Sequence, residues 1–392
     1  MITKRRCPSC DYNYGKIIYR IEMQLPEEIS VTGDYDIICC DRCDNCYADT
    51  ISTLEEYNDY YTNQNIYGGW NYNSSGNYDI EVIVRILNSF ADRKTRIIDM
   101  GCGNGKLLKT LKTYGYTNIV GIDPSLISIM SLRANGIDGI RGSIYEKPDK
   151  VLDKADVVIM TMVLEHLLCP DKAIQSISDN YLKADGHIIV SWPSFDNLII
   201  DNSLIYNNFN HEHINYFSQK SSDIFFKKCG FINVGHYLSC GILKTNYLQF
   251  TNIALYKKNG IFEYDTKNTV KDITGENSIK EYIDRVSKVE LSFINKINDE
   301  VQSGSKIVIW GSGALLFVLM KRSKLPQGNI RYIVDNNKNK QGRYIFGYEV
   351  KDPSELKTFD GAVIVSSMLY GEEIRQQIKE INKSLTKIYT VV

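Results

Sequence analysis

The sequence lacks both a long apolar run and an excess of charge of one sign. Lys and Arg together number 46, and Asp and Glu 47, among its 392 residues, which leaves a formal net charge of -1. The longest uninterrupted apolar stretches fall far short of the roughly 20 residues that a membrane-spanning helix requires. A nearly neutral chain also has no strong electrostatic attraction for nucleic acid or for an anionic membrane surface. We therefore expect neither a membrane nor a nucleic acid among its partners.

Histidine is scarce, with five residues, and the His-Glu-x-x-His pattern of zinc peptidases is absent. The first seven residues, Met-Ile-Thr-Lys-Arg-Arg-Cys, contain no apolar stretch of the kind found in a signal peptide, so we expect a cytoplasmic protein. Six of the ten cysteines nevertheless lie within the first 46 residues. Disulfide frameworks are spread more evenly and accompany secretion, so this clustering favours metal binding in a reducing compartment.

Two Cys-x-x-Cys motifs, at 7–10 and 40–43, account for most of that cluster. Two such motifs can place four thiolates around one Zn²⁺ in a closed tetrahedral site, which leaves no open position for catalysis and indicates a folding role. Cys39 and Cys46 offer alternative registers, and a group of reactive free thiols is the alternative to a metal site. The ligand set that we predict is Cys7, Cys10, Cys40 and Cys43.

A glycine-rich stretch at residues 96–106 organises the chain. A short apolar segment at 97–98 predicts a buried parallel strand, which ends at Asp99. Three glycines then predict a tight turn that reaches positive φ angles and lets the backbone approach a ligand, ahead of an amphipathic helix. A second apolar strand at 119–122 ends in Asp123, an acid placed to accept hydrogen bonds from a ribose diol.

The spacing of this stretch is Asp-x-Gly-x-Gly-x-Gly, which differs from the Gly-x-Gly-x-x-Gly of dinucleotide-binding folds. It resembles motif I of the class I S-adenosylmethionine-dependent methyltransferases, and Gly-Ile-Asp-Pro-Ser at 121–125 looks like their second cofactor motif. The alternative is any strand–turn–helix unit that contains glycines. The resemblance also places the strand and turn at 139–145 beside the adenine. The positions that it implies for S-adenosylmethionine are Asp99, Gly101, Gly103, Gly105, Asp123, Pro124, Ser143, Ile144 and Met162.

Two short motifs carry histidines that could act on a bound acceptor. The Val-Leu-Glu-His at 163–166 resembles a segment that borders donor and acceptor in small-molecule methyltransferases, although a lone histidine such as His166 is equally often structural. The segment at 210–218, Asn-His-Glu-His-Ile-Asn-Tyr-Phe-Ser, holds three ionisable groups in a row. No third metal ligand follows at a recognisable spacing, so an imidazole base fits better than a metal, with a hydrogen-bonded surface turn as the alternative.

The remaining chain suggests several domains. Residues 57–78 are rich in Tyr, Asn and Gly, which suits either a cover over a ligand cleft or an exposed connection. A second strand–turn–helix unit begins at 306, but its turn has only two glycines, which is weak evidence for NAD. The domains that we predict are a zinc module with a tyrosine-rich cover (1–75), a methyltransferase domain (76–258), a linker with a long amphipathic helix (259–303) and a C-terminal Rossmann-like domain (304–392).

The predicted fold class is α/β, with a Rossmann-like doubly wound methyltransferase sheet, a small zinc module and a second Rossmann-like domain. In this order the whole chain resembles the three-domain sugar C-methyltransferases, which act on nucleotide-linked 4-keto-deoxysugars. The resemblance is carried by the two cysteine motifs, by the segment at 211–218 and by Val-Asp-Asn-Asn-Lys-Asn-Lys-Gln-Gly-Arg at 334–343. It implies S-adenosylmethionine and structural Zn²⁺ as cofactors, a nucleotide-linked sugar as acceptor, and a monomer or homodimer.

The family's catalytic Glu and His match Glu212 and His213. The resemblance implies that His213 removes a proton to form an enolate, that Glu212 orients it or binds the sugar, and that His166 polarises the enolate oxygen. Asn210 stands where the family commonly has a tyrosine, which favours the alternative of O- or N-methylation of a sugar or another small polar acceptor. An RNA methyltransferase and a non-catalytic nucleotide-sugar binding protein are further alternatives. The near-neutral charge disfavours the first, and the intact glycine loop disfavours the second.

Overall fold

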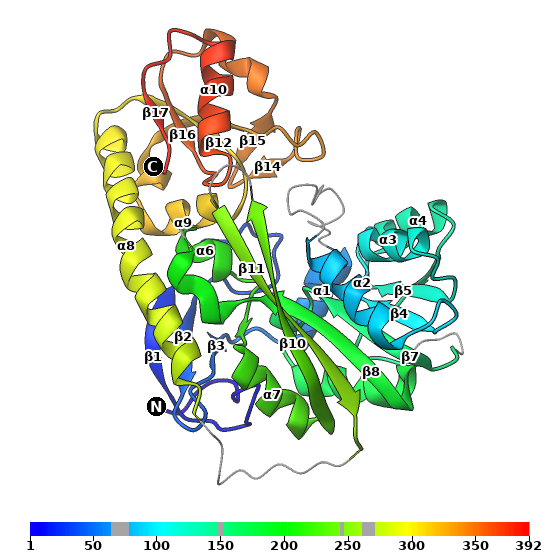
Figure 1. Ribbon diagram of the computed structural model, residues 1–392. Helices are drawn as coiled ribbons and strands as arrows, with labels where there is room; N and C mark the ends of the chain where they lie inside the picture. The colour runs from blue at the N-terminus through cyan, green and yellow to red at the C-terminus, as the bar shows by residue number, and fades with distance from the viewer. Residues whose placement is uncertain (64–77, 148–151, 202, 244–246, 261–270, 392) are drawn as a thin grey trace. The chain divides into compact units, whose positions relative to one another are not determined.

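The computed structural model describes residues 1–63, 78–147, 152–201, 203–243, 247–260 and 271–391, whose strands lie in three sheets (Figure 1). The largest sheet has seven strands in the order β10-β11-β8-β7-β4-β5-β6. These strands are β4 (Ile97–Met100), β5 (Ile119–Asp123), β6 (Asp138–Arg141), β7 (Ala155–Thr161), β8 (Leu182–Pro193), β10 (Phe231–Leu243) and β11 (Tyr247–Lys258).

Strands β4 to β8 of this sheet are parallel, and β10 and β11 complete it as an antiparallel pair. Successive residues of β4 point to opposite faces: Ile97 packs into one apolar cluster and Ile98 into the other. Helices α2 (Tyr78–Phe90), α3 (Lys106–Thr113) and α4 (Leu126–Ala134) contribute to the first cluster. Helices α5 (Pro170–Ser176) and α7 (Gln219–Lys228), with η3 (Ile177–Tyr181), contribute to the second. The predicted doubly wound α/β sheet is confirmed.

A four-stranded sheet contains the cysteine motifs. Its order is β1-β2-β3-β9, and its strands are β1 (Gly15–Ile21), β2 (Tyr35–Cys40), β3 (Cys46–Asp49) and β9 (Asn215–Tyr216). Strand β9 pairs antiparallel with β3, with Cys46 opposite Tyr216 and Tyr47 opposite Asn215. A strand that directly follows the segment Glu212-His213 therefore completes the sheet of the N-terminal module.

The third sheet lies near the end of the chain, in the order β14-β15-β13-β12-β16-β17. Its strands are β12 (Lys306–Trp310), β13 (Asn329–Val334), β14 (Tyr344–Ile345), β15 (Tyr348–Lys351), β16 (Ala362–Val365) and β17 (Ile388–Tyr389). All pairs except β14·β15 are parallel. The helices of this part are α9 (Ala314–Arg322) and α10 (Gly371–Ile381), with 3-10 turns η6 (Leu325–Gln327) and η7 (Pro353–Thr358). This is the parallel α/β arrangement expected after residue 304.

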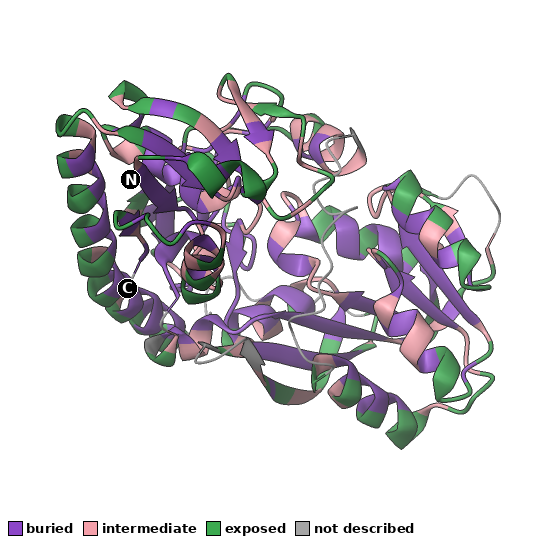
Figure 2. Cartoon of the chain, turned by 90° about the horizontal axis from the view of Figure 1, so that it is seen from above, coloured by how far each residue is buried: buried purple, intermediate pink, exposed green. Residues whose placement is uncertain are grey.

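Two further helices lie between these sheets in sequence, α6 (Ile205–Asn208) and the 30-residue α8 (Ile273–Gln302). Helix α8 buries Ile279, Val286 and Phe293 at helical spacing and exposes its opposite face, as Figure 2 shows. Within the segment 259–303, predicted as a linker with a long amphipathic helix, the helix begins at Ile273 and ends at Gln302.

The chain separates into two compact units. The first comprises Met1–Tyr19, Asp36–Asp201 and Glu212–Lys280, and the second comprises Arg20–Tyr35, Asn202–His211 and Glu281–Val392. The domain boundaries at 75/76, 258/259 and 303/304 stay predictions. No helix among the described residues is long and apolar enough to cross a membrane.

The tyrosine-rich segment begins as a helix, which corrects the loop predicted from its composition. Helix α1 (Leu54–Asn63) contains Tyr57 and Tyr60, and both side chains are buried. Thr53 and Glu56 cap it reciprocally: the Glu56 amide donates to Thr53 Oγ1 at 3.2 Å, and the Thr53 amide donates to Glu56 Oε2 at 2.6 Å. The rest of this segment, 64–77, lies outside the described residues.

Candidate active site

The glycine-rich turn between β4 and α3 has the backbone that its sequence predicts. Gly101, Gly103 and Gly105 have φ angles of 76°, 50° and 78°. At Gly105 a Cβ would also lie 2.2 Å from a methyl group of Leu132. A side chain at Gly105 is therefore excluded twice, by conformation and by packing.

Asp123 connects the two halves of the motif. Its Oδ2 accepts a hydrogen bond from the Gly103 amide at 2.9 Å, and its Oδ1 accepts one from the Ser125 amide at 2.9 Å. Each carboxylate oxygen has more than one acceptor direction, so these bonds hold the side chain in place and leave capacity for a ribose diol. Asp99 is 2% exposed, and its Oδ1 has no hydrogen bond among the described residues.

The other predicted donor-binding residues follow β5, β6 and β7. Pro124 precedes α4, whose N-cap Ser125 accepts from the Ser128 amide. Ser143 Oγ accepts from the Tyr145 amide at 3.3 Å. Ile144 packs against the second apolar cluster. These contacts place Ser143 and Ile144 just beyond the carboxyl end of β6, the edge of the sheet at which ligands bind in such folds.

Met162, directly after β7, is one of four described non-glycine residues with a positive φ, here 54°. Strain of this kind is found disproportionately at functional sites. The next residue, Val163, lies over the glycine turn, since a Cβ on Gly101 would come within 2.6 Å of its Cγ2. The segment that leads to His166 is thus in contact with the glycine-rich turn.

A short 3-10 turn, η2 (Leu164–His166), follows, and hydrogen bonds fix it to the segment around His213. The Ile214 amide donates to the Glu165 carbonyl at 2.9 Å. The Asn215 amide group donates to the carbonyls of Leu164 and Leu167 at 3.0 and 2.7 Å. Two motifs that are about fifty residues apart in sequence are therefore held together by one main-chain hydrogen bond and by the side-chain amide of Asn215.

The result is a cluster of the three predicted catalytic residues. The His166 and His213 rings lie 4.9 Å apart in an edge-to-face arrangement, with an interplanar angle of 70°. His166 Nδ1 lies 3.0 Å from the Glu212 carbonyl oxygen. Asn210 is also buried, and its Nδ2 donates to the Tyr206 carbonyl at 3.2 Å.

Two tyrosines of α1 complete this cluster; both belong to the segment predicted as a tyrosine-rich cover, but neither is among the predicted catalytic residues. Tyr60 Oη donates a hydrogen bond to Glu212 Oε1, and Tyr61 Oη lies 3.2 Å from His166 Nδ1. Burial and the nearby Glu212 raise the pKa of both phenols well above its ordinary value, so both hydroxyls keep their protons at neutral pH. The capping motif at Thr53 could have indicated the helix. The sequence around the two tyrosines does not indicate that they contact Glu212 and His166.

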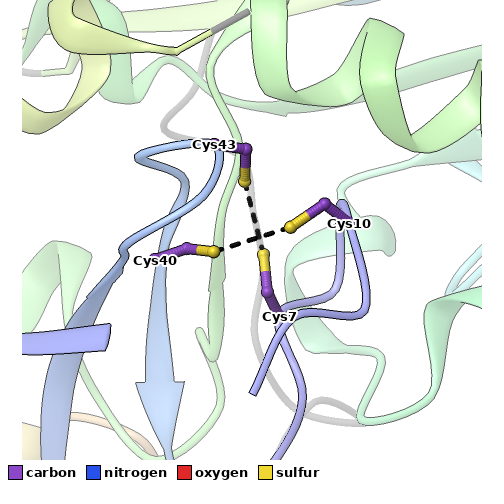
Figure 3. A group of neighbouring side chains, drawn as sticks. All are labelled: Cys7, Cys10, Cys40 and Cys43. Atoms are coloured by element: carbon purple, nitrogen blue, oxygen red, sulfur yellow. Dashed lines mark hydrogen bonds between the residues drawn. The ribbon is translucent and has the colours of Figure 1, made fainter. Parts of the chain in front are cut away.

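The cysteine motifs meet as the spacing predicts. Cys7 and Cys43 have their Sγ atoms 3.6 Å apart, Cys10 and Cys40 have theirs 3.5 Å apart, and the four sulfur atoms converge (Figure 3). All four Sγ atoms lie within 4.8 Å of one another. Tetrahedral Zn²⁺ with Zn–S bonds of about 2.3 Å requires sulfur separations of about 3.8 Å, so the four residues fit this ion. Burial raises the pKa of the Cys7 thiol, and a cation would reverse that effect.

The thiols of Cys39 and Cys46, the alternative ligands, do not belong to this group of four sulfur atoms. Both thiols donate instead toward the Asp44 carbonyl, at 3.4 and 3.8 Å. Cys39 forms a separate buried group with Asp44 and Glu276. Two lysines already neutralise Glu276, with Lys16 at 2.6 Å and Lys280 at 2.5 Å, which makes a second metal unnecessary there.

Arg5 joins the cysteine module to the histidine cluster. Its Nη1 donates to the carbonyls of Ala48 and Ile214, both at 3.3 Å. Its Nη2 donates to the Leu168 carbonyl at 3.0 Å and to Asn215 Oδ1 at 2.9 Å. One guanidinium thereby contacts the segment that follows His166 and the segment that follows His213, and Arg5 stands two residues before the first cysteine of the module.

Comparison with known proteins addresses the central part of the chain. Residues 76–236 match the family model described as a methyltransferase domain, and this range contains the glycine-rich turn, Asp123 and the histidine cluster. The chain is an S-adenosylmethionine-dependent methyltransferase. Residues 303–389 of the methyltransferase match a second model, described as C2185-like, N-terminal. No curated protein matches its sequence.

Solved structures similar to the methyltransferase cover about half of it. Magnesium protoporphyrin IX methyltransferase from Synechocystis PCC 6803 has 15% identity over 46% of this chain and 82% of its own, with a TM-score of 0.36. The putative methyltransferase in complex with the Haloferax volcanii Trm112 activator has 13% identity over 48% of this chain and 92% of its own, with a TM-score of 0.40. PH0226 protein from Pyrococcus horikoshii OT3 has 19% identity over 53% of this chain and 100% of its own, with a TM-score of 0.37. The domain assignment rests on the family model and the geometry.

The affinity of the methyltransferase for its donor is expected to depend on Asp99. Burial and the neighbouring Asp123 raise the pKa of Asp99 to about 7. S-adenosylmethionine carries positive charge, so its binding favours the ionised carboxylate, and affinity should rise about tenfold as pH increases from about 6 to the plateau above 7. Calorimetric titration at a series of pH values measures this. Asp99→Asn should bind more weakly and lose the dependence, and a wild-type affinity independent of pH would contradict it.

Proposed function

We propose that the methyltransferase transfers the methyl group to carbon in a nucleotide-linked sugar, in the first place a 4-keto-deoxysugar. The observation that carries this proposal is the contact of His166 with the His213 ring and with the Glu212 main-chain carbonyl, beside a segment that touches the glycine-rich turn. An acidic carbon next to a ketone needs a base within reach and a polar group at the developing enolate oxygen, and this cluster provides both.

In the proposed mechanism His213 accepts the proton from the carbon beside the ketone. The electron pair of the broken C–H bond becomes an enolate, and His166 polarises its oxygen. S-adenosylmethionine supplies an electrophilic methyl group, which the enolate carbon attacks in line, so that the C–S electron pair stays on the departing sulfur. Glu212 orients His213 or binds the sugar, and Tyr60 holds the Glu212 carboxylate through its hydroxyl.

The proposal assigns Zn²⁺ to Cys7, Cys10, Cys40 and Cys43 in a structural role. All four thiols are fully buried and would occupy every tetrahedral position, so no ligand position is left for an acceptor. Such a reduced thiolate site suits a cytoplasmic protein. The C-terminal α/β part, by its resemblance, would bind the nucleotide of the acceptor.

The second candidate is O- or N-methylation of a sugar or another small polar acceptor. It is favoured by Asn210, which replaces the tyrosine common in sugar C-methyltransferases and whose amide is turned toward the Tyr206 carbonyl. A hydroxyl or amine also needs a base, so His213 would keep its role while the enolate would disappear.

One experiment separates the two candidates. The purified enzyme is incubated with isotope-labelled S-adenosylmethionine and a panel of nucleotide-linked 4-keto and 4-hydroxy sugars. Mass spectrometry detects products, and NMR locates the methyl group. We expect a methyl group on the carbon beside the ketone. A methyl group on oxygen or nitrogen would replace the enolate mechanism with the second candidate, and a lack of product from every sugar would overturn both sugar assignments.

A further inference from the structure

Glu165 is a buried carboxyl group to which the proposed mechanism assigns no role. Its side chain is 0% exposed, and neither of its oxygens has a hydrogen bond among the described residues. An isolated carboxylate is costly in such surroundings unless a proton or a positive charge compensates it. The carbonyl of the same residue accepts from Ile214, so the position of the side chain is fixed by the main chain.

The two histidines of the site face this carboxyl group. Glu165 Oε1 lies 3.8 Å from His166 Nε2, and Glu165, His166 and His213 each place one titrating atom within 4.8 Å of those of the other two. The other ionisable groups around the cluster are Tyr61 and Tyr60, which keep their protons, and Glu212, which is held by Tyr60. Within the described part of the chain the Glu165 carboxyl group forms no ion pair with a lysine or arginine, so imidazole is its basic neighbour.

The hydrogen bond at the other nitrogen of His166 determines what this contact can do. The Glu212 carbonyl at Nδ1 can only accept, whereas the Tyr61 hydroxyl, 3.2 Å from the same nitrogen, can donate or accept, so a hydrogen atom on Nδ1 is the assignment that satisfies both partners. Nε2 is then the nitrogen whose protonation can change, and it is the nitrogen that faces Glu165. Burial raises the pKa of Glu165 to about 8, which brings the carboxyl group into the range in which imidazole titrates.

We propose that Glu165 is a positioning residue that holds one proton in common with His166 and His213 and thereby sets the charge of the histidine pair. With Glu165 ionised, the group of three side chains is neutral when one imidazole is protonated. When Glu165 is ionised and both imidazoles are neutral, a proton that His213 takes from the acceptor brings the group from a charge of -1 to neutrality instead of creating an isolated buried cation. Only the kinetic consequence rests on the proposed function, because the proton sharing is a property of the acceptor-free protein.

The direct test is the titration of the histidine signals by NMR in protein with ¹⁵N-labelled histidine. In Glu165→Gln, the His166 and His213 midpoints should fall by about one to three pH units, because a facing negative charge is removed. His187 and His236, which lie in β8 and β10, are internal controls and should not move. Unchanged His166 and His213 midpoints would overturn the proposal.

A second measurement uses the wild-type protein, in case the variant does not fold. With ¹³C-carboxyl-labelled glutamate, one signal should titrate above about pH 7, together with the histidines. Glu165 titrating in the ordinary glutamate range would overturn the proposal. A structural role alone would not link these titrations.

The kinetic test compares Glu165→Gln with Asp171→Asn, a control carboxylate in the first turn of α5. We expect kcat to fall about 100-fold in the first variant, with unchanged donor affinity and a displaced pH profile, and to stay unchanged in the second. An unchanged pH profile in an active Glu165→Gln enzyme would overturn the proposal. If no sugar is methylated but the linked titrations are observed, the proposed acceptor fails while the role of Glu165 in the histidine pair is supported.

Discussion

Exchange of His213 for glutamine is expected to abolish turnover while the affinity for S-adenosylmethionine stays as in the wild type. Glutamine keeps similar size and hydrogen-bonding capacity but cannot accept the proton of the acceptor. General-base catalysis contributes about 100-fold to 10,000-fold, so kcat should fall at least to that extent. Single-turnover assays with labelled donor measure the chemical step, and calorimetry measures donor binding separately.

The matched control is His187→Gln, the same change in a histidine of β8 whose ring packs against Phe90 outside the cluster. It should keep full activity. Turnover at wild-type rate in His213→Gln would remove His213 from the mechanism and leave His166 as the remaining imidazole base. A parallel loss of donor binding would instead assign His213 to the donor site.

Replacing one predicted zinc ligand is expected to have the largest effect on stability. Cys43→Ala leaves three buried thiols that cannot satisfy tetrahedral Zn²⁺, and binding of a structural metal contributes directly to the free energy of folding. We expect loss of bound zinc and destabilisation by more than about 4 kcal/mol, beyond the usual range of single substitutions. Elemental analysis measures the metal, and chemical unfolding measures the stability.

Cys39→Ala and Cys46→Ala are the controls, because these thiols are equally buried but point toward the Asp44 carbonyl. Both variants should retain a stoichiometric zinc ion and lose only the modest stability that a small buried substitution costs. Loss of zinc in either control, with zinc retained in Cys43→Ala, would shift the ligand set to the other register. A wild-type protein that binds no zinc would identify the cluster as free thiols.

Features encoded by short runs of sequence could be predicted. The apolar runs of β4 and β5 and the glycines between β4 and α3 define the parallel strands and the left-handed turn locally, and the structure has both. The positive φ angles at Gly101 and Gly105 follow from residue type in the same way. The spacing of the cysteine motifs was also sufficient, because each motif forms its own tight turn.

Features that depend on distant partners could not be predicted. The Tyr, Asn and Gly content of residues 57–78 predicts a loop, whereas the part up to Asn63 belongs to helix α1. Its stability comes from the burial of Tyr57 and Tyr60, together with the Thr53–Glu56 capping box, a local signal that was overlooked. The burial of the Glu165 carboxyl group without a hydrogen bond depends on which residues surround it in the folded chain, and a sequence pattern cannot predict these neighbours.

The cysteine module and the histidine cluster are physically connected, because β9 pairs with β3 and Arg5 contacts both. We therefore expect their stabilities to be coupled. The proposed zinc ion would fix the hairpin that bears Cys46; Cys46 lies opposite Tyr216, and His213 stands three residues before Tyr216. Anything that stabilises one element in its native position reduces the entropic cost of ordering the other. Thermodynamic linkage then requires reciprocity: if bound zinc increases the affinity for the acceptor, bound acceptor should increase the affinity for zinc by the same factor. A structural zinc ion that does not contact the acceptor would in this way act as an allosteric effector of acceptor binding.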